Sequence, residues 1–148
     1  AALAKKAGAW ATIDYSKENF VQRVNELTEG AKCPVVFDGV GKDTWEGSLD
    51  CLQPRGLMVS FGNASGPVTG VNIGILATKG SLFLTRPTLA THILPRVRLE
   101  ASCEELFDLM ASGKINIEIE ARYSLRDAAR AHADLAARKT VGSLVLVP

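Results

Sequence analysis

A phosphate-binding loop is the first chemistry that this sequence suggests. The segment Gly39-Val40-Gly41-Lys42-Asp43-Thr44 follows the apolar run Val35-Val36-Phe37 and combines glycines, a lysine and a hydroxyl. A nucleoside-triphosphate loop needs a contiguous Gly-Lys-Ser/Thr after an earlier glycine, and Asp43 interrupts it with a negative charge. A dinucleotide loop needs a third glycine where Thr44 stands. The spacing therefore argues against a primary phosphate site and predicts a glycine-rich turn after a buried strand.

Polar and glycine residues end three apolar stretches of the sequence. These ends are Asp14-Tyr15, Asp38-Gly39-Val40 and Phe61-Gly62-Asn63. Because ligands of a doubly wound parallel sheet bind at the carboxyl ends of its strands, three such ends predict one crevice. Tyr15 could stack on an aromatic ring there, and Asn63 could hydrogen-bond an amide or a ribose. The same residue types also suit ordinary turns, so both interpretations stay open.

No other set of residues has the spacing of an active site. The cysteines Cys33, Cys51 and Cys103 are far apart in the sequence, and the only histidines are His92 and His132. Neither a structural zinc site, nor a disulfide framework, nor a Ser-His-Asp triad is indicated. Three cysteines without a disulfide pattern favour a reducing compartment, so we expect a cytoplasmic protein.

Charge and hydropathy exclude two classes of partner. The 148 residues include 17 Lys and Arg against 16 Asp and Glu, which gives a formal charge of +1. A nucleic-acid partner is therefore not expected, because such proteins carry a basic face. No apolar run approaches the roughly 20 residues that span a bilayer, so no membrane association is expected either.

Hydrophobic periodicity predicts the elements that would position the three strand ends. Strands and helices alternate in the order β, α, β, α, β, which is typical of a parallel sheet with helical crossovers. A loop rich in Gly, Asn and Ser follows, and then one more strand. The expected elements are strands at 10–15, 35–37, 57–61 and 81–85, a helix capped by Ser16 that closes at Gly30, and a helix that begins at Lys42 or Asp43 and breaks at Pro54.

The last third of the sequence has a different hydrophobic pattern. Its expected elements are a helix at 99–112, a half-exposed strand in which Ile115, Ile117 and Ile119 alternate with polar residues, a helix from a capping box at Ser124 and Asp127 to Arg138, and a strand at 143–147. The alternation of apolar and polar residues in this strand predicts that the last third packs on something other than the parallel sheet. The first residues, Ala1–Ala7, read as the end of a helix that Gly8 stops, so we expect a fragment.

The ordered motifs resemble a known enzyme family. The series GAWATIDY, VVFDGVGKDTWEGSLDCLQPRGLMVSFGNASGPVTG, GSLFLTRP and DAARAHADLAARKTVGSLVLVP is similar to the quinone oxidoreductase family, the zeta-crystallin-like, zinc-independent branch of medium-chain dehydrogenases. The resemblance covers essentially the whole chain. It implies an NADPH-dependent enzyme that transfers hydride to quinones or α,β-unsaturated carbonyls, and a homodimer that forms through the Rossmann sheets, here the strand Ser81–Thr85.

The resemblance also implies a domain organisation. Residues 1–88 would be a partial NAD(P)-binding Rossmann domain, that is, an α/β doubly wound parallel sheet whose first strand and glycine-rich loop lie before Ala1. Residues 89–148 would be a helix that continues this domain and then the carboxyl-terminal segment of a GroES-like catalytic domain. Such a fragment is expected to be inactive alone. The alternative is a non-catalytic nucleotide-binding or crystallin-like structural module.

Cofactor-binding residues follow from the same resemblance, position by position. Tyr15 would line the adenosine phosphate site, and Gly39 and Val40 the adenine and ribose edge. Five consecutive residues would follow the nicotinamide half, and three more would flank the nicotinamide amide through backbone groups: Phe61, Gly62, Asn63, Ala64 and Ser65, then Thr85, Arg86 and Pro87. Arg138 would reach the cofactor from the last helix. The resemblance implies no metal ligand and names no proton donor.

Overall fold

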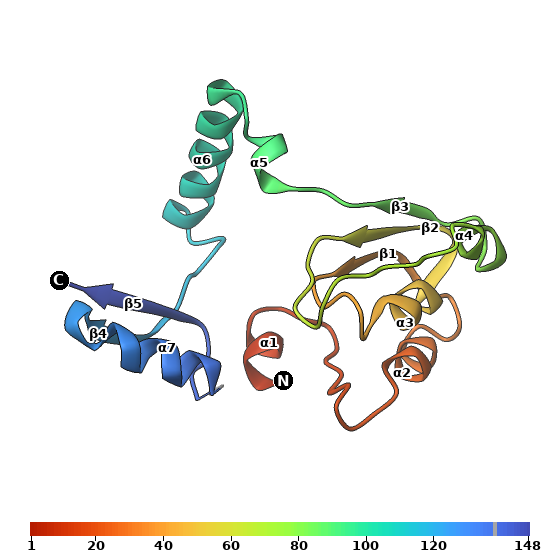
Figure 1. Cartoon of the computed structure of the whole chain (residues 1–148), viewed down its shortest axis with the longest axis horizontal. Coiled ribbons are helices and arrows are strands. Elements are labelled where there is room, and N and C mark those ends of the chain that lie inside the picture. The colour runs from red at the N-terminus through yellow and green to blue at the C-terminus, as the bar shows by residue number, and fades with distance from the viewer. Residues whose placement is uncertain (138) are drawn as a thin grey trace. The chain divides into compact units, whose positions relative to one another are not determined.

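The structure, a computed structural model, describes residues 1–137 and 139–148 and divides into two units (Figure 1). Unit 1 is Ala1–His92 and unit 2 is Ile93–Pro148. Unit 1 contains a three-stranded parallel sheet, and unit 2 contains a two-stranded parallel sheet. The prediction of an α/β fold with parallel strands is therefore confirmed.

Helices and strands alternate along unit 1, and its sheet has the strand order β1-β2-β3. The register places Val36 beside Met58 and Met58 beside Leu84, with parallel neighbours throughout. All three strands therefore end at the same edge of the sheet. The elements of this unit are α1 (Ala2–Lys6), α2 (Phe20–Leu27), β1 (Cys33–Asp38), α3 (Trp45–Asp50), β2 (Leu52–Ser60), α4 (Gly74–Thr78), β3 (Phe83–Thr85) and α5 (Leu89–His92).

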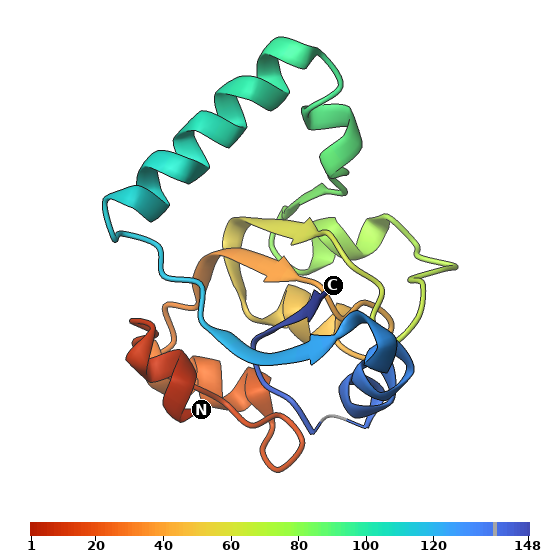
Figure 2. The same cartoon turned by 90° about the vertical axis from the view of Figure 1, so that its left-hand side faces the viewer.

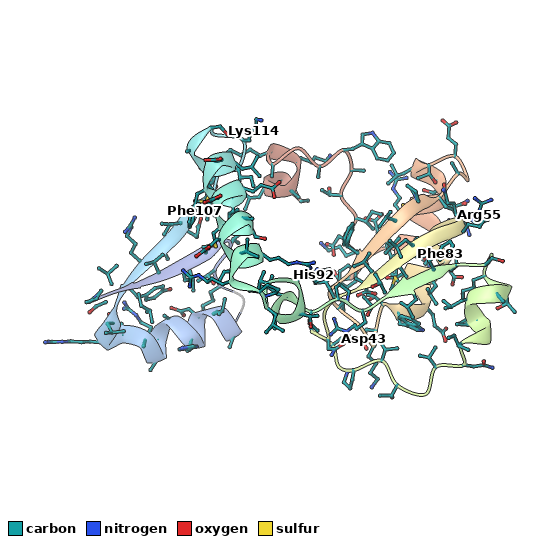
Figure 3. All side chains as sticks on the ribbon, turned by 90° about the horizontal axis from the view of Figure 1, so that it is seen from above. Asp43, Arg55, Phe83, His92, Phe107 and Lys114 are labelled. Atoms are coloured by element: carbon teal, nitrogen blue, oxygen red, sulfur yellow. The ribbon has the colours of Figure 1, made fainter. Side chains whose placement is uncertain are left out.

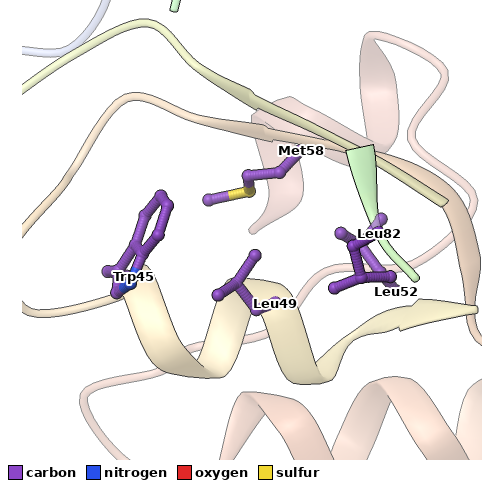
Figure 4. Close-up of a cluster of buried hydrophobic side chains, with 5 residues drawn as sticks. All are labelled: Trp45, Leu49, Leu52, Met58 and Leu82. Carbon is purple, nitrogen blue, oxygen red and sulfur yellow. The ribbon is translucent and has the colours of Figure 1, made fainter. Parts of the chain in front are cut away.

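The core of unit 1 lies between α3 and one face of the sheet (Figure 4). Trp45 and Leu49 come from α3, and Met58 comes from the middle of β2. Leu49 and Met58 are completely buried, and burial of a side chain of this size stabilises the fold by about 1.5–3 kcal/mol. The other two members of the cluster, Leu52 and Leu82, begin β2 and precede β3.

Two expected elements near the start of unit 1 differ from the structure. Residues 10–15 form no strand, because none of the described strands pairs with this segment. The following helix begins at Phe20, and its cap is Asn19, whose side chain accepts from Val21 N and Gln22 N. Ser16 is engaged elsewhere, since its N–H and hydroxyl both donate to Asp14.

Strand β2 begins earlier than expected and makes a detour. Cys33 pairs with Leu52, but Val35 pairs with Leu57, so the residues between those two partners leave the register. Arg55 adopts a positive φ of 61° within the detour, and its N–H donates to Gly80 O at 2.8 Å. Leu52 was expected on the inner face of the preceding helix, but it is the first residue of β2. It is buried as expected, because α3 and β2 both face the core.

Helix α2 packs against α3 through a glycine. A Cβ on Gly47 would lie 2.4 Å from the ring carbon Cζ of Phe20, which is closer than real contacts allow. The absence of a side chain at position 47 therefore lets the Phe20 ring rest on the backbone of α3. Helix α4 was not expected; it begins at Gly74, the last residue of the Gly- and Asn-rich stretch after β2.

Unit 2 contains a helix followed by a strand-helix-strand arrangement (Figure 2). The elements are α6 (Arg96–Ala111), β4 (Ile119–Ser124), the 3₁₀ helix η1 (Leu125–Asp127), α7 (Ala128–Ala136) and β5 (Ser143–Val147). The last strand has the expected bounds. The alternating segment does not: the strand begins at Ile119, and Ile115 and Ile117 precede it without a partner strand among the described residues. Ser124 caps η1 by accepting from Arg126 N rather than pairing with Asp127.

Candidate functional site

Two loops meet at the carboxyl edge of the unit 1 sheet. The first loop, residues 39–44, joins β1 to α3, and the second loop, residues 61–66, follows β2. Asp43 in the first loop and Arg55 in the β2 detour mark opposite ends of this sheet in Figure 3. Backbone hydrogen bonds join the loops: Phe61 N and Gly62 N donate to Asp38 O (2.9 and 3.3 Å), Ala64 N to Gly39 O (3.2 Å), Ser65 N to Val40 O (2.8 Å) and Lys42 N to Gly66 O (3.1 Å).

Glycines allow this close approach of the two loops. A Cβ on Gly62 would lie 2.3 Å from Gly39 O, and one on Gly41 would lie 2.8 Å from Gly66 O. Gly41 also has a φ of 89°, which favours glycine. The contact is therefore one of backbone on backbone, and any side chain at positions 41 or 62 would separate the loops.

The Ser65 side chain is committed to holding the loops together. Its hydroxyl donates to Val40 O at 2.8 Å and accepts from Asp43 N at 3.0 Å. Both contacts lie within the two loops, so a ligand at Ser65 would contact its backbone more readily than its hydroxyl.

Asp38, the last residue of β1, is 4% exposed and accepts hydrogen bonds from four donors. Burial by itself raises the pKa of the Asp38 carboxyl, but the hydrogen bonds outweigh burial and hold this pKa below its ordinary value. The four donors are Val40 N (2.8 Å), Gly41 N (2.9 Å), Thr44 Oγ1 (2.8 Å) and Ser48 Oγ (2.8 Å). The strand-end position of Asp38 was expected but this role was not, because Thr44 and Ser48 become its neighbours only when α3 folds back.

Three residues of the second loop, Phe61, Asn63 and Ala64, present their side chains to solvent. The Phe61 ring is 54% exposed and lies over Gly39, where an added Cβ would be 3.1 Å from the ring. Asn63 and Ala64 are also exposed. The predicted residues of the two loops thus form one continuous surface with an aromatic ring, an amide and open backbone.

Of the other predicted cofactor residues, those at the end of β3 and directly after it are joined to the end of β2. Thr85 pairs with Val59 in the sheet, and the Arg86 guanidinium donates to Ser60 O at 2.9 Å. Pro87 follows directly in the chain. The backbone after β3 is therefore held near the end of β2.

The two remaining predicted residues, Tyr15 and Arg138, make none of the described contacts with the two loops. The Tyr15 ring is 61% exposed and contacts the Phe20 ring edge-on, with centroids 6.4 Å apart. Arg138 lies outside the described residues, so its predicted role stays a prediction.

Comparison with known proteins identifies the family. A family described as zinc-binding dehydrogenase matches residues 7–146. This chain belongs to the zinc-binding dehydrogenase family. A quinone oxidoreductase of Pseudomonas aeruginosa is 64% identical over all 148 residues, which span 46% of that protein.

Solved structures of quinone oxidoreductases have the same fold as this family member. The Pseudomonas syringae enzyme is 57% identical with a TM-score of 0.92, and the match covers all of this chain and 46% of that one. The Escherichia coli enzyme complexed with NADPH is 56% identical with a TM-score of 0.91, over 98% of this chain and 45% of that one. The resemblance to quinone oxidoreductases and the Rossmann-type α/β fold class are confirmed. The chain spans about half the length of these relatives.

The described residues of this chain do not fit a zinc site, despite the description of the family. Among them, no group of three or more His, Cys, Asp or Glu side chains is close enough to hold a metal ion. Cys51 is buried, and burial first, then the nearby Cys33 thiol and Asp50 carboxylate, raise the pKa of its thiol to about 11. We therefore derive no step through zinc, and zinc independence of the whole protein stays a prediction.

A cavity of about 630 Å³ lies beside the first loop, within unit 1. Trp45, Val68 and Ile75 contribute apolar surface, and Lys42 and Glu46 contribute charge. The cavity was not expected from the sequence, because Trp45 has the spacing of a core residue and the stretch 67–72 has the composition of a loop.

In the part of the chain that the structure describes, no helix is long and apolar enough to cross a membrane.

Proposed function

We propose that the whole protein is an NADPH-dependent quinone oxidoreductase and that this chain supplies part of its cofactor site. One observation carries the proposal: two glycine-containing loops meet backbone to backbone at the carboxyl edge of a parallel sheet, where such folds bind dinucleotides. The identity of 56% to an Escherichia coli enzyme complexed with NADPH supports the choice of cofactor.

We assign the cofactor contacts to the residues around this edge. The nicotinamide half would follow the second loop, where Asn63 and Ala64 are exposed and the Phe61 ring offers an apolar wall. Ser65 would contribute its backbone, since its hydroxyl is engaged. The remaining assignments are Gly39, Val40, Asn63 and Ala64 on the two loops, Thr85, Arg86 and Pro87 at the end of β3 and directly after it, and Tyr15 and Arg138 on the strength of the resemblance.

The chemistry would need little from these side chains. Bound NADPH supplies a hydride, which an electron-poor quinone or α,β-unsaturated carbonyl can accept. The residues of the two loops would hold the nicotinamide in one orientation, and the Phe61 ring would keep water from one side of it. No described residue is assigned as a proton donor.

Cofactor oxidation tests this proposal directly. The whole protein is mixed with NADPH and a panel of benzoquinones, naphthoquinones and enones, and loss of the reduced-nicotinamide absorbance is followed. We expect acceptor-dependent loss that is faster with NADPH than with NADH. Tight NADPH binding without turnover on any acceptor would favour the alternative, a non-catalytic nucleotide-binding module. Absence of binding would refute the proposal altogether.

We further propose that the whole protein is a homodimer that pairs through the segment Ser81–Thr85. In the described sheet β3 is an edge strand, and an open edge invites pairing with a second copy. Leu82 is 6% exposed and belongs to the core, so the exposed Phe83 is the better probe. We expect Phe83→Lys to elute as a monomer in size-exclusion chromatography while Leu125→Lys, an exposed position of unit 2, stays dimeric. A dimeric Phe83→Lys would exclude this interface.

We also propose a cytoplasmic location for the whole protein. All three cysteines, Cys33, Cys51 and Cys103, are free, as expected in a reducing compartment. Immunodetection after cell fractionation tests this, and recovery in an extracytoplasmic fraction would contradict it.

A further inference from the structure

Asp38 holds a charge in the interior without a basic partner. Its carboxylate is 4% exposed, and no Lys, Arg or His in the described ranges forms an ion pair with it. Neutral donors satisfy both of its oxygens instead. Burial of an unpaired charge is costly, so the arrangement persists only where several hydrogen bonds compensate it.

The carboxylate fixes both ends of the first loop. Oδ1 accepts from Val40 N at 2.8 Å and from Gly41 N at 2.9 Å, which sets the turn that leaves β1. Oδ2 accepts from Thr44 Oγ1 and Ser48 Oγ, both at 2.8 Å, which sets the beginning of α3. One side chain thus determines where residues 39–44 lie between the strand and the helix.

The position of the first loop determines that of the second. The main-chain oxygen of Asp38 accepts from Phe61 N and Gly62 N, and the oxygens of Gly39 and Val40 accept from the next part of the second loop. Gly62 is also in direct backbone contact with Gly39. A displacement of residues 39–41 would therefore displace residues 61–65.

We propose that Asp38 is a positioning residue for the cofactor site: its buried carboxylate holds both loops in the arrangement that binds NADPH. This inference rests on the proposed function. Asp38 does not touch the cofactor, and it acts through the backbone of Gly39, Val40 and the second loop. Its removal should lower the fraction of protein whose loops are arranged for binding, and the apparent Kd rises in inverse proportion to that fraction.

Two substitutions separate positioning from charge. In Asp38→Asn the retained oxygen can still accept from Val40 N and Gly41 N, and the hydroxyls of Thr44 and Ser48 can rotate to accept from the new amide. Asp38→Ala removes all four contacts. We expect Asp38→Ala to raise the Kd for NADPH at least about tenfold and Asp38→Asn to raise it by less than about threefold.

The turnover number gives the readout that distinguishes positioning from general damage. Bound NADPH would itself order the loops, so kcat at saturating NADPH should stay within about twofold of wild type in Asp38→Ala while KM rises. Amide hydrogen exchange of the unliganded protein should accelerate at Gly41 and Ala64. The matched control is Asp50→Asn, which breaks the ion pair with Lys79 away from both loops and should leave the Kd unchanged.

The experiment is NADPH titration and steady-state kinetics of the whole protein in these variants. If the wild type does not bind NADPH, the proposed function fails and this inference fails with it. If the wild type binds and Asp38→Ala binds equally well, or loses kcat as much as affinity, the inference alone is overturned. Should Asp38→Ala not fold, Thr44→Val combined with Ser48→Ala removes the contacts to Oδ2, and an unchanged Kd there would equally overturn it.

Discussion

Replacement of Gly62 by alanine tests whether the contact between the two loops is as close as described. The new Cβ would lie 2.3 Å from Gly39 O and 2.8 Å from the carbonyl carbon and Cα of Gly39, whereas ordinary contacts begin at 3.4 Å. These neighbours are backbone atoms, so no rotamer change can relieve the clash. The loops must separate by about 1 Å, as close-packed interiors leave no free space.

The expected loss of stability follows from this separation. The bonds Gly62 N to Asp38 O and Ala64 N to Gly39 O are already 3.3 and 3.2 Å long, so the shift would break both. Two hydrogen bonds contribute about 2 kcal/mol, and overpacking costs about 1–3 kcal/mol. Alanine recovers about 0.4–1 kcal/mol by restricting the unfolded chain. We therefore expect Gly62→Ala to lower the free energy of unfolding by about 3 kcal/mol.

Urea unfolding followed by tryptophan fluorescence measures this change. Trp45 is 8% exposed and Trp10 is 75% exposed, so a Trp10→Phe background leaves the buried indole as the reporter of unit 1. The matched control is Gly39→Ala at the same contact, where the Cβ meets only the exposed Phe61 ring, which can move. The control should lose less than about 1 kcal/mol. Equal losses in the two variants, or a loss below about 1 kcal/mol in Gly62→Ala, would refute the backbone contact.

Three further measurements probe individual side chains. Because the folded pKa of Asp38 is depressed, its carboxylate stabilises the fold above the unfolded pKa of about 3.9, and this contribution disappears as pH falls through the folded value. In Asp38→Asn, the free energy of unfolding measured with urea should therefore fall less steeply as the pH is lowered into the acid range. A pH dependence equal to that of the wild type would contradict the assignment. Cys51, with a thiol pKa raised to about 11, should react with iodoacetamide at pH 8 more slowly than Cys103, and equal rates by peptide mass spectrometry would contradict its burial. Leu49→Ala should cost about 2–5 kcal/mol in thermal unfolding while Leu94→Ala, 81% exposed, costs under about 0.5 kcal/mol; similar values would argue against this core.

Short-range patterns predicted the elements that depend on local periodicity. The run at 35–37 lies inside β1, and the last strand, Ser143–Val147, has its expected bounds. Both are apolar runs bounded by turn residues, a signal that a few neighbouring residues carry. The alternating Ile115 and Ile117 have an equally clear signal, yet they lie before β4, because a strand also needs a partner at the right distance.

The candidate site shows the same division between local and long-range information. The ends at Gly39 and Gly62 lie side by side, as expected if the strands are parallel. The hydrogen bonds of the Ser65 hydroxyl to the first loop could not be expected. Its partners, Asp43 and Val40, lie more than twenty residues away in the sequence and become neighbours only after α3 has formed. Tyr15 was expected at a strand end, but the segment before it forms no strand.

The packing of the Phe20 ring against the backbone at Gly47 limits how these two positions can vary among related chains. The ring occupies the space of the missing side chain at position 47, with 2.4 Å from Cζ to an added Cβ. A relative with a larger residue at the position of Gly47 must therefore carry a smaller or differently shaped residue at that of Phe20, or shift α2 as a whole. The two positions should change together in an alignment of relatives, as a linked pair that records helix packing rather than catalysis.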